Sequence, residues 1–340
     1  MPFYPLIQKN LKSLGGSVIV GERRSKMRKV AIGIILTLSL IGILTSAFNI
    51  QLARASGTIY IKADGSVDPP TAPITSIDNI TYAFTDNIYD EIIIERSNIV
   101  IDAAGYAVEG SGTGNGFTLS SVDNVTIKNA DIRDFTYGIY LELAHHNAIF
   151  GNTLENNDYD GIALFDSSNN SILENTIRGN SWYGIGLYYS LNNDVYKNLV
   201  TNNYVGITLF DSSDNLIVHN NFINNTEQIY SEFSINAWDN GCAGNYWSDY
   251  NGTDLNGDGI GDTFVPWLNV DYYPLMSPYV AGDINHDAIV DIFDAIIMST
   301  AFGSTPQVPH WNPHCDLHED NQIDIFDAII LAGNFGKTWS

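Results

Sequence analysis

Residues 161–210, GIALFDSSNNSILENTIRGNSWYGIGLYYSLNNDVYKNLVTNNYVGITLF, carry a short pattern that returns at a fixed interval. The same pattern continues toward the N-terminus of the chain. Its glycine-led segments are GFTL at Gly116, GIYL at Gly138, GIAL at Gly161, GIGL at Gly184 and GITL at Gly206, spaced 22, 23, 23 and 22 residues apart. A fixed period of this length indicates a solenoid, in which each repeat stacks on the next.

The hydrophobic pattern within each repeat decides between helix and strand. Apolar residues alternate over short runs, as at Ile162 and Leu164, and Gly, Asn and Asp cluster between these runs. Period two with frequent turn residues is typical of strands. We therefore predict an all-β fold, a right-handed parallel β-helix of the pectate-lyase-like kind, whose coils stack at about 4.8 Å.

Asparagines recur in phase with the repeats. They form two series, Asn147, Asn170, Asn193 and Asn215, and Asn152, Asn175, Asn198 and Asn220. An amide at the same turn of every coil can hydrogen-bond to its equivalents above and below. The asparagines are thus predicted to be architectural.

Aromatic residues also fall in register. Tyr159, Trp182 and Tyr204 each lie two residues before a repeat glycine, and Phe165, Tyr188 and Phe210 each lie four residues after one. Such rows could form platforms on which sugars stack, or they could pack turns and core. The sequence favours packing slightly, because it does not indicate which side of the strand the rings occupy.

Catalytic residues are not assigned. Hydrolysis of glycosides needs two carboxylates about 5–9.5 Å apart. Asp166 and Asp211 share the phase FDSS two coils apart, roughly 10 Å, and Asp160 is a further candidate. Nearly every turn carries an Asp, however, so such pairs arise by chance. The polygalacturonase pattern is absent, and the seven histidines form no ligand cluster. The sequence favours a protein that is not an enzyme.

One aspartate-rich pattern occurs twice near the C-terminus, and each copy runs into an apolar helix. The copies are GDINHDAIVDIFDAII from Gly282 and CDLHEDNQIDIFDAII from Cys315. Loop positions 1, 3, 5, 9 and 12, with the main-chain carbonyl of position 7, supply the oxygen ligands that Ca²⁺ prefers. The predicted ligands are Asp283, Asn285, Asp287, Ile289, Asp291 and Asp294 in the first loop, and Asp316, His318, Asp320, Gln322, Asp324 and Asp327 in the second.

The two loops depart from the ideal pattern. Position 6, normally Gly, is Ala288 in the first loop and Asn321 in the second, and Ala adopts the left-handed conformation poorly. His318 at position 3 is a poor Ca²⁺ ligand. We expect both loops to form and the second to bind Ca²⁺ more weakly.

Residues 281–340 resemble a type I dockerin, a small all-α module that closes its loops with Asp at position 12. The resemblance implies a Ca²⁺ cofactor and a cohesin-like scaffold partner. Helix positions that contact cohesin in this family are Ile292, Phe293, Ile325 and Phe326 here. Identical pairs suggest docking in two orientations; alternatively these side chains pack the two helices together.

Residues of about 58–276 resemble the NosD-like family of periplasmic and surface β-helix proteins, also described as carbohydrate-binding and sugar-hydrolysis repeats. The repeats and the ending NYWSDY…DGIGD…YPLM carry the resemblance. In this ending Asp254, Asn256, Asp258 and Asp262 form a weaker candidate Ca²⁺ loop. Its closing carboxylate is missing, and Asp249 or Asp271 could supply it.

The N-terminus indicates export. A basic flank, the apolar run 30–44 and an Ala-x-Ala exit near Ala55 are typical of a cleaved signal peptide, or of an uncleaved anchor. We also hypothesise that Met27 is the true start. The expected domains are therefore 1–55 (signal or anchor), 56–250 (β-helix), 251–280 (Asp/Gly-rich segment) and 281–340 (dockerin-like).

The formal net charge of −24 argues against nucleic acid as a partner. Three functions stay open: a monomeric secreted or surface protein that binds polysaccharide or packs in the envelope, moored by its dockerin; a polysaccharide hydrolase or lyase; and metal delivery to an exported oxidoreductase. Cys242 and Cys315 receive no role.

Overall fold

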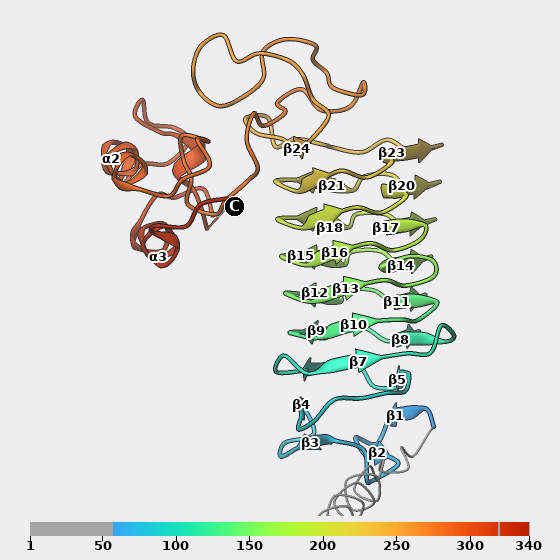
Figure 1. Ribbon diagram of the computed structural model, residues 1–340. Helices are drawn as coiled ribbons and strands as arrows, with labels where there is room; N and C mark the ends of the chain where they lie inside the picture. The colour runs from blue at the N-terminus through green and yellow to red at the C-terminus, as the bar shows by residue number, and fades with distance from the viewer. Residues whose placement is uncertain (1–56, 319, 340) are drawn as a thin grey trace, which may run out of the picture. The chain divides into compact units, whose positions relative to one another are not determined.

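Stacked coils of parallel strands form most of this computed structural model, which describes residues 57–318 and 320–339. The predicted signal or anchor and Met27 lie outside the described residues. Among the described helices, none is both long and apolar enough to span a membrane. The strands belong to three sheets that run along the stack, and each coil from β5 to β22 contributes one strand to each sheet (Figure 1).

The strands of the nine-stranded sheet are, in order across it, β2 (Val67–Asp68), β1 (Ile59–Ile61), β5 (Ile92–Ile94), β8 (Asn115–Ser120), β11 (Tyr137–Glu142), β14 (Ile162–Phe165), β17 (Tyr183–Tyr188), β20 (Val205–Phe210) and β23 (Glu227–Glu232). Those of the eight-stranded sheet are β21 (Leu216–Val218), β18 (Asp194–Tyr196), β15 (Ser171–Leu173), β12 (Ala148–Phe150), β9 (Val125–Lys128), β6 (Ile99–Asp102), β4 (Thr81–Phe84) and β3 (Ile74–Ser76). Those of the seven-stranded sheet are β24 (Tyr246–Trp247), β22 (Asn221–Ile223), β19 (Leu199–Thr201), β16 (Thr176–Arg178), β13 (Thr153–Glu155), β10 (Asp131–Arg133) and β7 (Ala107–Glu109).

The register of the sheets stacks like residues on one another. In the nine-stranded sheet, Leu141 of β11 pairs with Leu164 of β14, which pairs with Leu187 of β17. The chain coils in the right-handed sense, as β-crossover connections do. The predicted fold class, a right-handed parallel β-helix, is confirmed for the described repeats.

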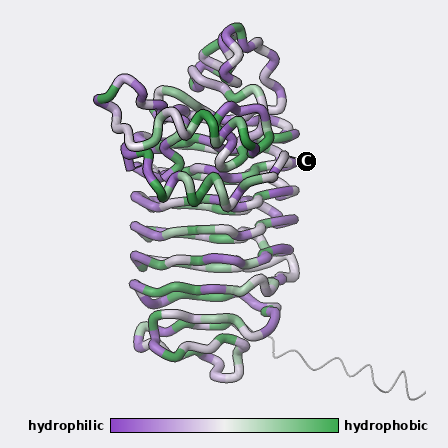
Figure 2. Tube along the Cα trace, turned by 90° about the vertical axis from the view of Figure 1, so that its left-hand side faces the viewer, coloured by the Kyte–Doolittle hydropathy of each residue, from purple (hydrophilic) through white to green (hydrophobic). Residues whose placement is uncertain are grey.

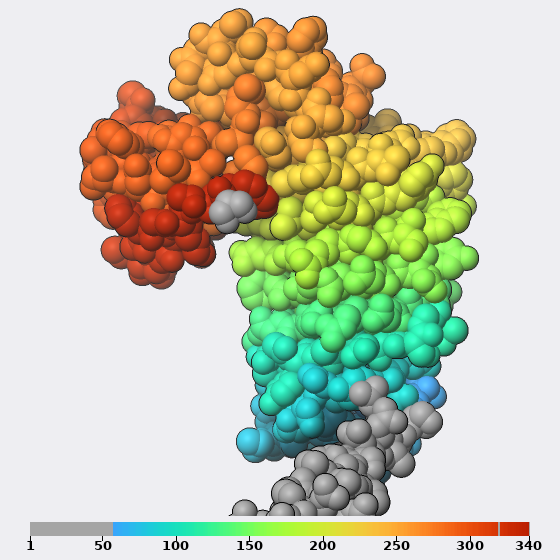
Figure 3. All heavy atoms as spheres, viewed as in Figure 1, coloured from blue at the N-terminus to red at the C-terminus, as the bar shows by residue number. Residues whose placement is uncertain are grey.

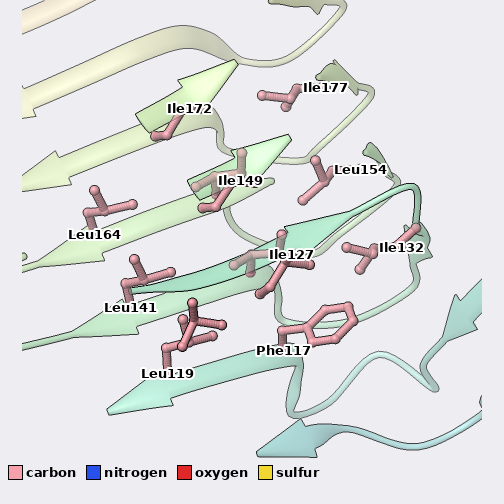
Figure 4. Close-up of a cluster of buried hydrophobic side chains, with 14 of the residues drawn as sticks. Phe117, Leu119, Ile127, Ile132, Leu141, Ile149, Leu154, Leu164, Ile172 and Ile177 are labelled. Atoms are coloured by element: carbon pink, nitrogen blue, oxygen red, sulfur yellow. The ribbon is translucent and has the colours of Figure 1, made fainter. Parts of the chain in front are cut away.

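Columns of aliphatic side chains fill the coil interior. Figure 4 shows one column, Leu119, Leu141 and Leu164, facing the columns that contain Ile127 and Ile132 from the other two sheets. Each of these side chains is at most 1% exposed. Along the chain, hydrophobic strand segments alternate with hydrophilic turns (Figure 2), and successive coils pack directly on each other (Figure 3). Each coil buries its apolar face against its neighbours.

The predicted asparagine ladders are present and are more extensive than the sequence pattern indicated. In both predicted series, each side-chain oxygen accepts from the main-chain N–H and the amide of the preceding member, as Asn170 does from Asn147 at 2.8 and 3.1 Å. Two further ladders were missed: Asn157, Asn180, Asn203 and Asn225, and Ser167, Ser190, Ser212 and Ser234. These ladders give buried turns their hydrogen-bond partners.

Both ends of the β-helix are covered. At the first coils, β2 and β3 pair in antiparallel fashion with β1 and β4. At the other end the carboxylate of Asp271 is buried and accepts from Asn245 N at 2.9 Å and Trp247 Nε1 at 2.8 Å. Covered edges protect the stack from pairing with other strands.

The C-terminal module contains α2 (Ile292–Ala301), the 3₁₀ turn η1 (Pro313–Cys315) and α3 (Ile325–Asn334). Both α-helices directly follow the predicted loops. A small core of its own holds the module together, formed by Ile284, Val290, Met298, Ala301, Cys315, Ile323 and Leu331. Cys315 is thus a buried core residue, and neither it nor Cys242 forms a disulfide in the described chain.

Candidate functional site

The outer surface of the nine-stranded sheet contains a buried carboxyl group. Asp160 lies two residues before the start of β14 and is only 2% exposed. The hydroxyl of Tyr188, on the neighbouring strand β17, donates to Asp160 Oδ2 at 3.2 Å. Burial raises the pKa of Asp160 to about 7, although the Tyr188 hydrogen bond opposes this change. Asp160 can therefore exchange a proton near neutral pH.

Glycine at position 186 makes this arrangement possible. A Cβ at Gly186 would lie 2.7 Å from Asp160 Oδ2 and 2.7 Å from the Tyr188 ring. Real Cβ contacts are longer, so any side chain here would separate the carboxyl from the phenol. The sequence shows Gly186 only as the variable residue of GIGL, and its spatial role could not be predicted from that.

Three tyrosines lie within electrostatic reach of Asp160. Burial, and then the charge of Asp160, raise the pKa of Tyr137 to about 12, and the same two causes raise the pKa values of Tyr183 and Tyr188. No cationic side chain contributes to the pKa of Asp160. The carboxyl thus lies in an aromatic environment without a compensating positive charge.

The predicted aromatic row Tyr159, Trp182 and Tyr204 is at the surface. The three side chains are 44%, 48% and 56% exposed. Tyr159 and Trp182 stack with ring centroids 5.6 Å apart, and Tyr159 also approaches Tyr137 at 5.5 Å. These rings do not fill the core, although Tyr159 and Trp182 stack on one another across successive turns.

The second aromatic row is more closely packed. Phe165 and Tyr188 stack with centroids 4.5 Å apart and an interplanar angle of 10°. Tyr140 approaches Phe165 at 5.3 Å. Together the two rows border the surface that contains Asp160, so that flat apolar rings lie beside a polar group.

The other two carboxylate candidates lie elsewhere. Asp166 and Asp211 occupy exposed turns after β14 and β20, both with φ of 47°. Asp160 and Asp166 lie at opposite ends of β14, roughly 15–20 Å apart along the strand. The structure therefore does not bring Asp160 together with either candidate as the pair that glycoside hydrolysis requires.

The two aspartate-rich loops of the C-terminal module form as expected. In the first loop Asp283 accepts from the N–H groups of Asp287 and Ala288, and Asp294 accepts from Ile284 N at 2.7 Å. In the second, Asp316 accepts from Asp320 N and Asn321 N, and Asp327 accepts from His318 N at 2.8 Å. In each loop, two aspartate carboxylates therefore accept hydrogen bonds from main-chain N–H groups of the loop.

The turn residue at position 6 is left-handed in both loops. Ala288 has φ of 68° and Asn321 has φ of 64°. The strain predicted for Ala288 is therefore present, because a Cβ disfavours this conformation.

Two predicted ligands in each loop also cap a helix. Asp291 caps α2 in a reciprocal capping box with Asp294, and Asp324 caps α3 in the same way with Asp327. This role was not predicted from the sequence, although a capping residue followed three positions later by an acidic residue, before an apolar run, is a signal for it.

The first loop is the more buried of the two. Asp283 is 4% exposed and Asp294 is fully buried. Burial raises the pKa of Asp283 to about 7, and the nearby charges of Asp294 and Asp287 add to this effect. These oxygens suit a hard cation. Yet no three His, Cys, Asp or Glu side chains of the described residues are placed to hold a metal by themselves. A Ca²⁺ ion would need Asn285 and main-chain carbonyls as well.

The weaker loop 254–262 has a similar pattern. Asp254 accepts from Gly257 N and Gly259 N, Asp262 accepts from Leu255 N, and Asn256 donates to Asp258 at 3.0 Å. The carboxylate of Asp271 already accepts from Asn245 N and Trp247 Nε1, which argues against Asp271 as the closing ligand of this loop.

The predicted partner-binding side chains are exposed. Ile292 and Phe293 are 56% and 60% exposed, and Ile325 and Phe326 are 57% and 54% exposed. They do not pack the helices together. The module therefore presents two equivalent apolar patches, to which the structure adds Ile296 and Ile329 one turn further on.

Fold and surface together define a parallel β-helix protein with an aromatic, acidic sheet face. A comparison with protein families gives a match over residues 56–252 to the family described as "Periplasmic copper-binding protein (NosD)". This chain belongs to the NosD family, and hence to a group of exported proteins.

Several solved structures are similar. A mutant of the periplasmic alginate epimerase AlgG has 22% identity over 51% of this chain and 51% of its own, with a TM-score of 0.35. The AlgE6 A-module, an Azotobacter vinelandii mannuronan C-5 epimerase, has 15% identity over 46% and 51%, with a TM-score of 0.38. The Dettilon tailspike protein has 12% identity over 56% and 55%, with a TM-score of 0.35. The chain spans about half the length of these structures. Curated proteins give no significant match.

Copper, which the family description implies, does not fit the described residues. Copper favours clustered imidazole or thiolate ligands. His145 and His146 have ring centroids 6.5 Å apart, and His145 Nδ1 already accepts from Ser168 N. His286 Nε2 and His314 Nδ1 do meet, at 3.2 Å, but these two nitrogens are hydrogen-bonded to each other. No set of three candidate ligand side chains in the described parts of the chain could hold the ion.

Proposed function

We propose that this protein binds polysaccharide on the outer face of its nine-stranded sheet. The observation that carries the proposal is the exposed row Tyr159, Trp182 and Tyr204, one aromatic ring per coil. Sugar rings stack on flat aromatic faces, and a row repeated at about 4.8 Å offers a continuous platform along the stack.

The setting of the row supports this role. Residues that served only to pack the turns would be covered, whereas Trp182 is nearly half exposed. Exposed aromatic groups in a row are costly to solvate and indicate a binding surface. The buried polar group of Asp160 beside the row could supply a directed hydrogen bond, as binding sites of small molecules usually do.

A glycan array followed by product analysis tests this function. The variant Trp182→Ala should bind the recognised glycan about 10-fold more weakly, since loss of one stacked ring costs about 1.5 kcal/mol. Tyr272→Ala is the matched control, because Tyr272 is 59% exposed but lies in the segment 251–280, after the last strand of the β-helix. Equal affinity of Trp182→Ala and wild type would refute the platform.

We propose further that the C-terminal module is a Ca²⁺-dependent dockerin that moors the protein to a cohesin-like partner. The two equivalent exposed patches, with Phe293 in one and Phe326 in the other, support docking in either of two orientations. A cohesin bait should therefore bind Phe293→Ala and Phe326→Ala but not the double variant. Loss of binding in either single variant would contradict the two-orientation proposal.

An enzyme that modifies polysaccharide is the second candidate function. The proton-exchange range of Asp160, with a pKa of about 7, favours it. Altered glycan products that disappear in Asp160→Asn would establish it. Delivery of metal to an exported oxidoreductase finds no support in the described residues.

A further inference from the structure

A strip of small residues crosses the sheet face beside Asp160. Ala163, Gly186 and Thr208 are in register on β14, β17 and β20. Tyr140 pairs with Ala163 at one end of the strip, and Tyr230 pairs with Thr208 at the other. Large side chains thus border a strip of small residues that are all buried.

One polar atom on this strip has no partner. Thr208 is 2% exposed, and its Oγ1 makes no hydrogen bond in the structure. A buried hydroxyl without a partner costs about 1–3 kcal/mol. Such groups are uncommon in folded proteins, and a ligand could satisfy this one.

Tyr188 covers the middle of the strip. Its ring lies directly over Gly186, and its hydroxyl is the side-chain partner of Asp160. Rotation of this single side chain would expose Gly186 and leave Asp160 Oδ2 free to accept from another donor. Asp160 and Thr208 would then be the polar groups on either side of the space that the Tyr188 ring had occupied.

The charge of the face selects the kind of ligand. No strand of the nine-stranded sheet contains Lys or Arg, whereas Glu142, Glu227 and Glu232 all lie on it. An anionic ligand would be repelled, and a cationic one attracted.

The tyrosines around Asp160 also favour a positively charged ligand. Burial, and then the negative charge of Asp160, raises the pKa values of Tyr137, Tyr183 and Tyr188, and the Tyr188 hydroxyl donates to Asp160 Oδ2 at 3.2 Å. Aromatic rings near a carboxylate attract ammonium groups through their faces. A bound ammonium would also return Asp160 to its ionised form, because an opposite charge lowers the pKa of a carboxyl group.

We propose that Asp160, Tyr137, Tyr183 and Thr208 form a subsite for a sugar unit with a free amino group, so that the polysaccharide recognised is a cationic amino-sugar polymer. The ammonium replaces the hydroxyl of Tyr188 at Asp160 Oδ2, and a hydroxyl of the same sugar meets Thr208 Oγ1. This inference rests on the proposed polysaccharide-binding function and names its substrate class.

Calorimetric titration of the full chain at mildly acidic pH tests the subsite. The probes are a β-1,4-linked glucosamine hexasaccharide, its fully N-acetylated counterpart, and putrescine as an amine without sugar. We expect the free-amine hexasaccharide to bind at least about 10-fold more tightly than the acetylated one, about 1.4 kcal/mol. Putrescine should bind weakly, because it cannot stack on the aromatic row.

The variant Asp160→Asn keeps the size of the side chain and removes its charge. It should abolish the preference for the free amine, because the loss of affinity falls on the free-amine sugar far more than on the acetylated one. Asp166→Asn, in an exposed turn of the same coil, should retain the preference. Tyr183→Leu gives an independent check should Asp160→Asn melt early, and it should weaken binding of the free-amine sugar alone.

The outcomes separate the subsite from the wider function. Equal affinity for both hexasaccharides, or a preference that persists in Asp160→Asn, would overturn the amino-sugar subsite and leave glycan binding intact. Putrescine binding as tight as that of the free-amine hexasaccharide would overturn the polymer as its ligand. Absence of binding to every glycan on the array would overturn both proposals.

Discussion

Removing one asparagine from a ladder should destabilise the β-helix severely. Asn198 is fully buried and donates to Ile172 O at 2.8 Å, to Tyr196 O at 3.1 Å and to Asn220 Oδ1 at 2.9 Å. Its own side-chain oxygen accepts from Asn175 N and Nδ2, both at 3.0 Å. Asn198→Ala removes all five hydrogen bonds and leaves partners on the two neighbouring coils without replacement.

The magnitude follows from the buried groups left without partners. Two or three such groups, at about 1–3 kcal/mol each, give a loss of about 2–9 kcal/mol in the free energy of unfolding. That is a large part of the roughly 5–15 kcal/mol by which folded domains are usually stable. The variant should therefore unfold at markedly lower urea concentration.

Urea titration followed by far-UV circular dichroism measures this loss. Asn202→Gly is the matched control, because Asn202 is exposed in the same coil and Gly accepts its left-handed φ of 58°. The control should change stability by less than about 0.5 kcal/mol. A loss below about 1 kcal/mol in Asn198→Ala would refute the view that the ladder carries stability.

Three other perturbations are expected to have clear outcomes. Ile162→Asp places a charge in the fully buried core and should unfold several coils, at a cost above about 4 kcal/mol; an unchanged melting curve would contradict the register. The pKa of Asp160 is about 7 in the folded chain and near 3.8 in the unfolded chain, so the folded state binds the proton more tightly. The free energy of unfolding of the wild type should therefore fall by about 4 kcal/mol as pH rises from about 4 to 7. Asp160→Asn should remove this part of the pH dependence, and an identical slope in both proteins would show that Asp160 is not the group concerned. Residues 281–340, expressed alone, should become helical on addition of Ca²⁺ and much less so with Mg²⁺. Asp283→Ala should impair this Ca²⁺-induced folding more than Asp316→Ala. Full helicity in excess chelator would contradict the idea that metal drives folding.

The repeats made the β-helix predictable. Each coil obeys the same rule, a Gly before an alternating apolar run, so five copies such as those at Gly138 and Gly161 reinforce one inference. The third asparagine ladder, which begins at Asn157, has the same spacing as the first two, and closer inspection of the period would have found it. The loops before α2 and α3 were predictable for a related reason, because a tandem pattern at fixed spacing rarely arises by chance.

The site could be predicted only in part. The sequence shows that Tyr159 and Trp182 occupy the same position in successive repeats. The repeat spacing alone, however, does not say whether a residue before the strand faces the interior or solvent. Asp160 was one aspartate among many, and its importance depends on burial and on the absent Cβ of Gly186, which lies 26 residues further along the chain. Contacts between coils of this kind have no local signature in the sequence.

The one-ring-per-coil arrangement has a consequence for how this protein can change over generations. A duplication or loss of one whole repeat, such as the 23 residues from Gly161 to the residue before Gly184, would keep every ladder in phase. It would add or remove one aromatic ring and one step of about 4.8 Å from the platform. The length of carbohydrate chain accommodated could thus vary in whole units, while the chemistry of each unit stayed the same. Insertions of any other length would be confined to the turns.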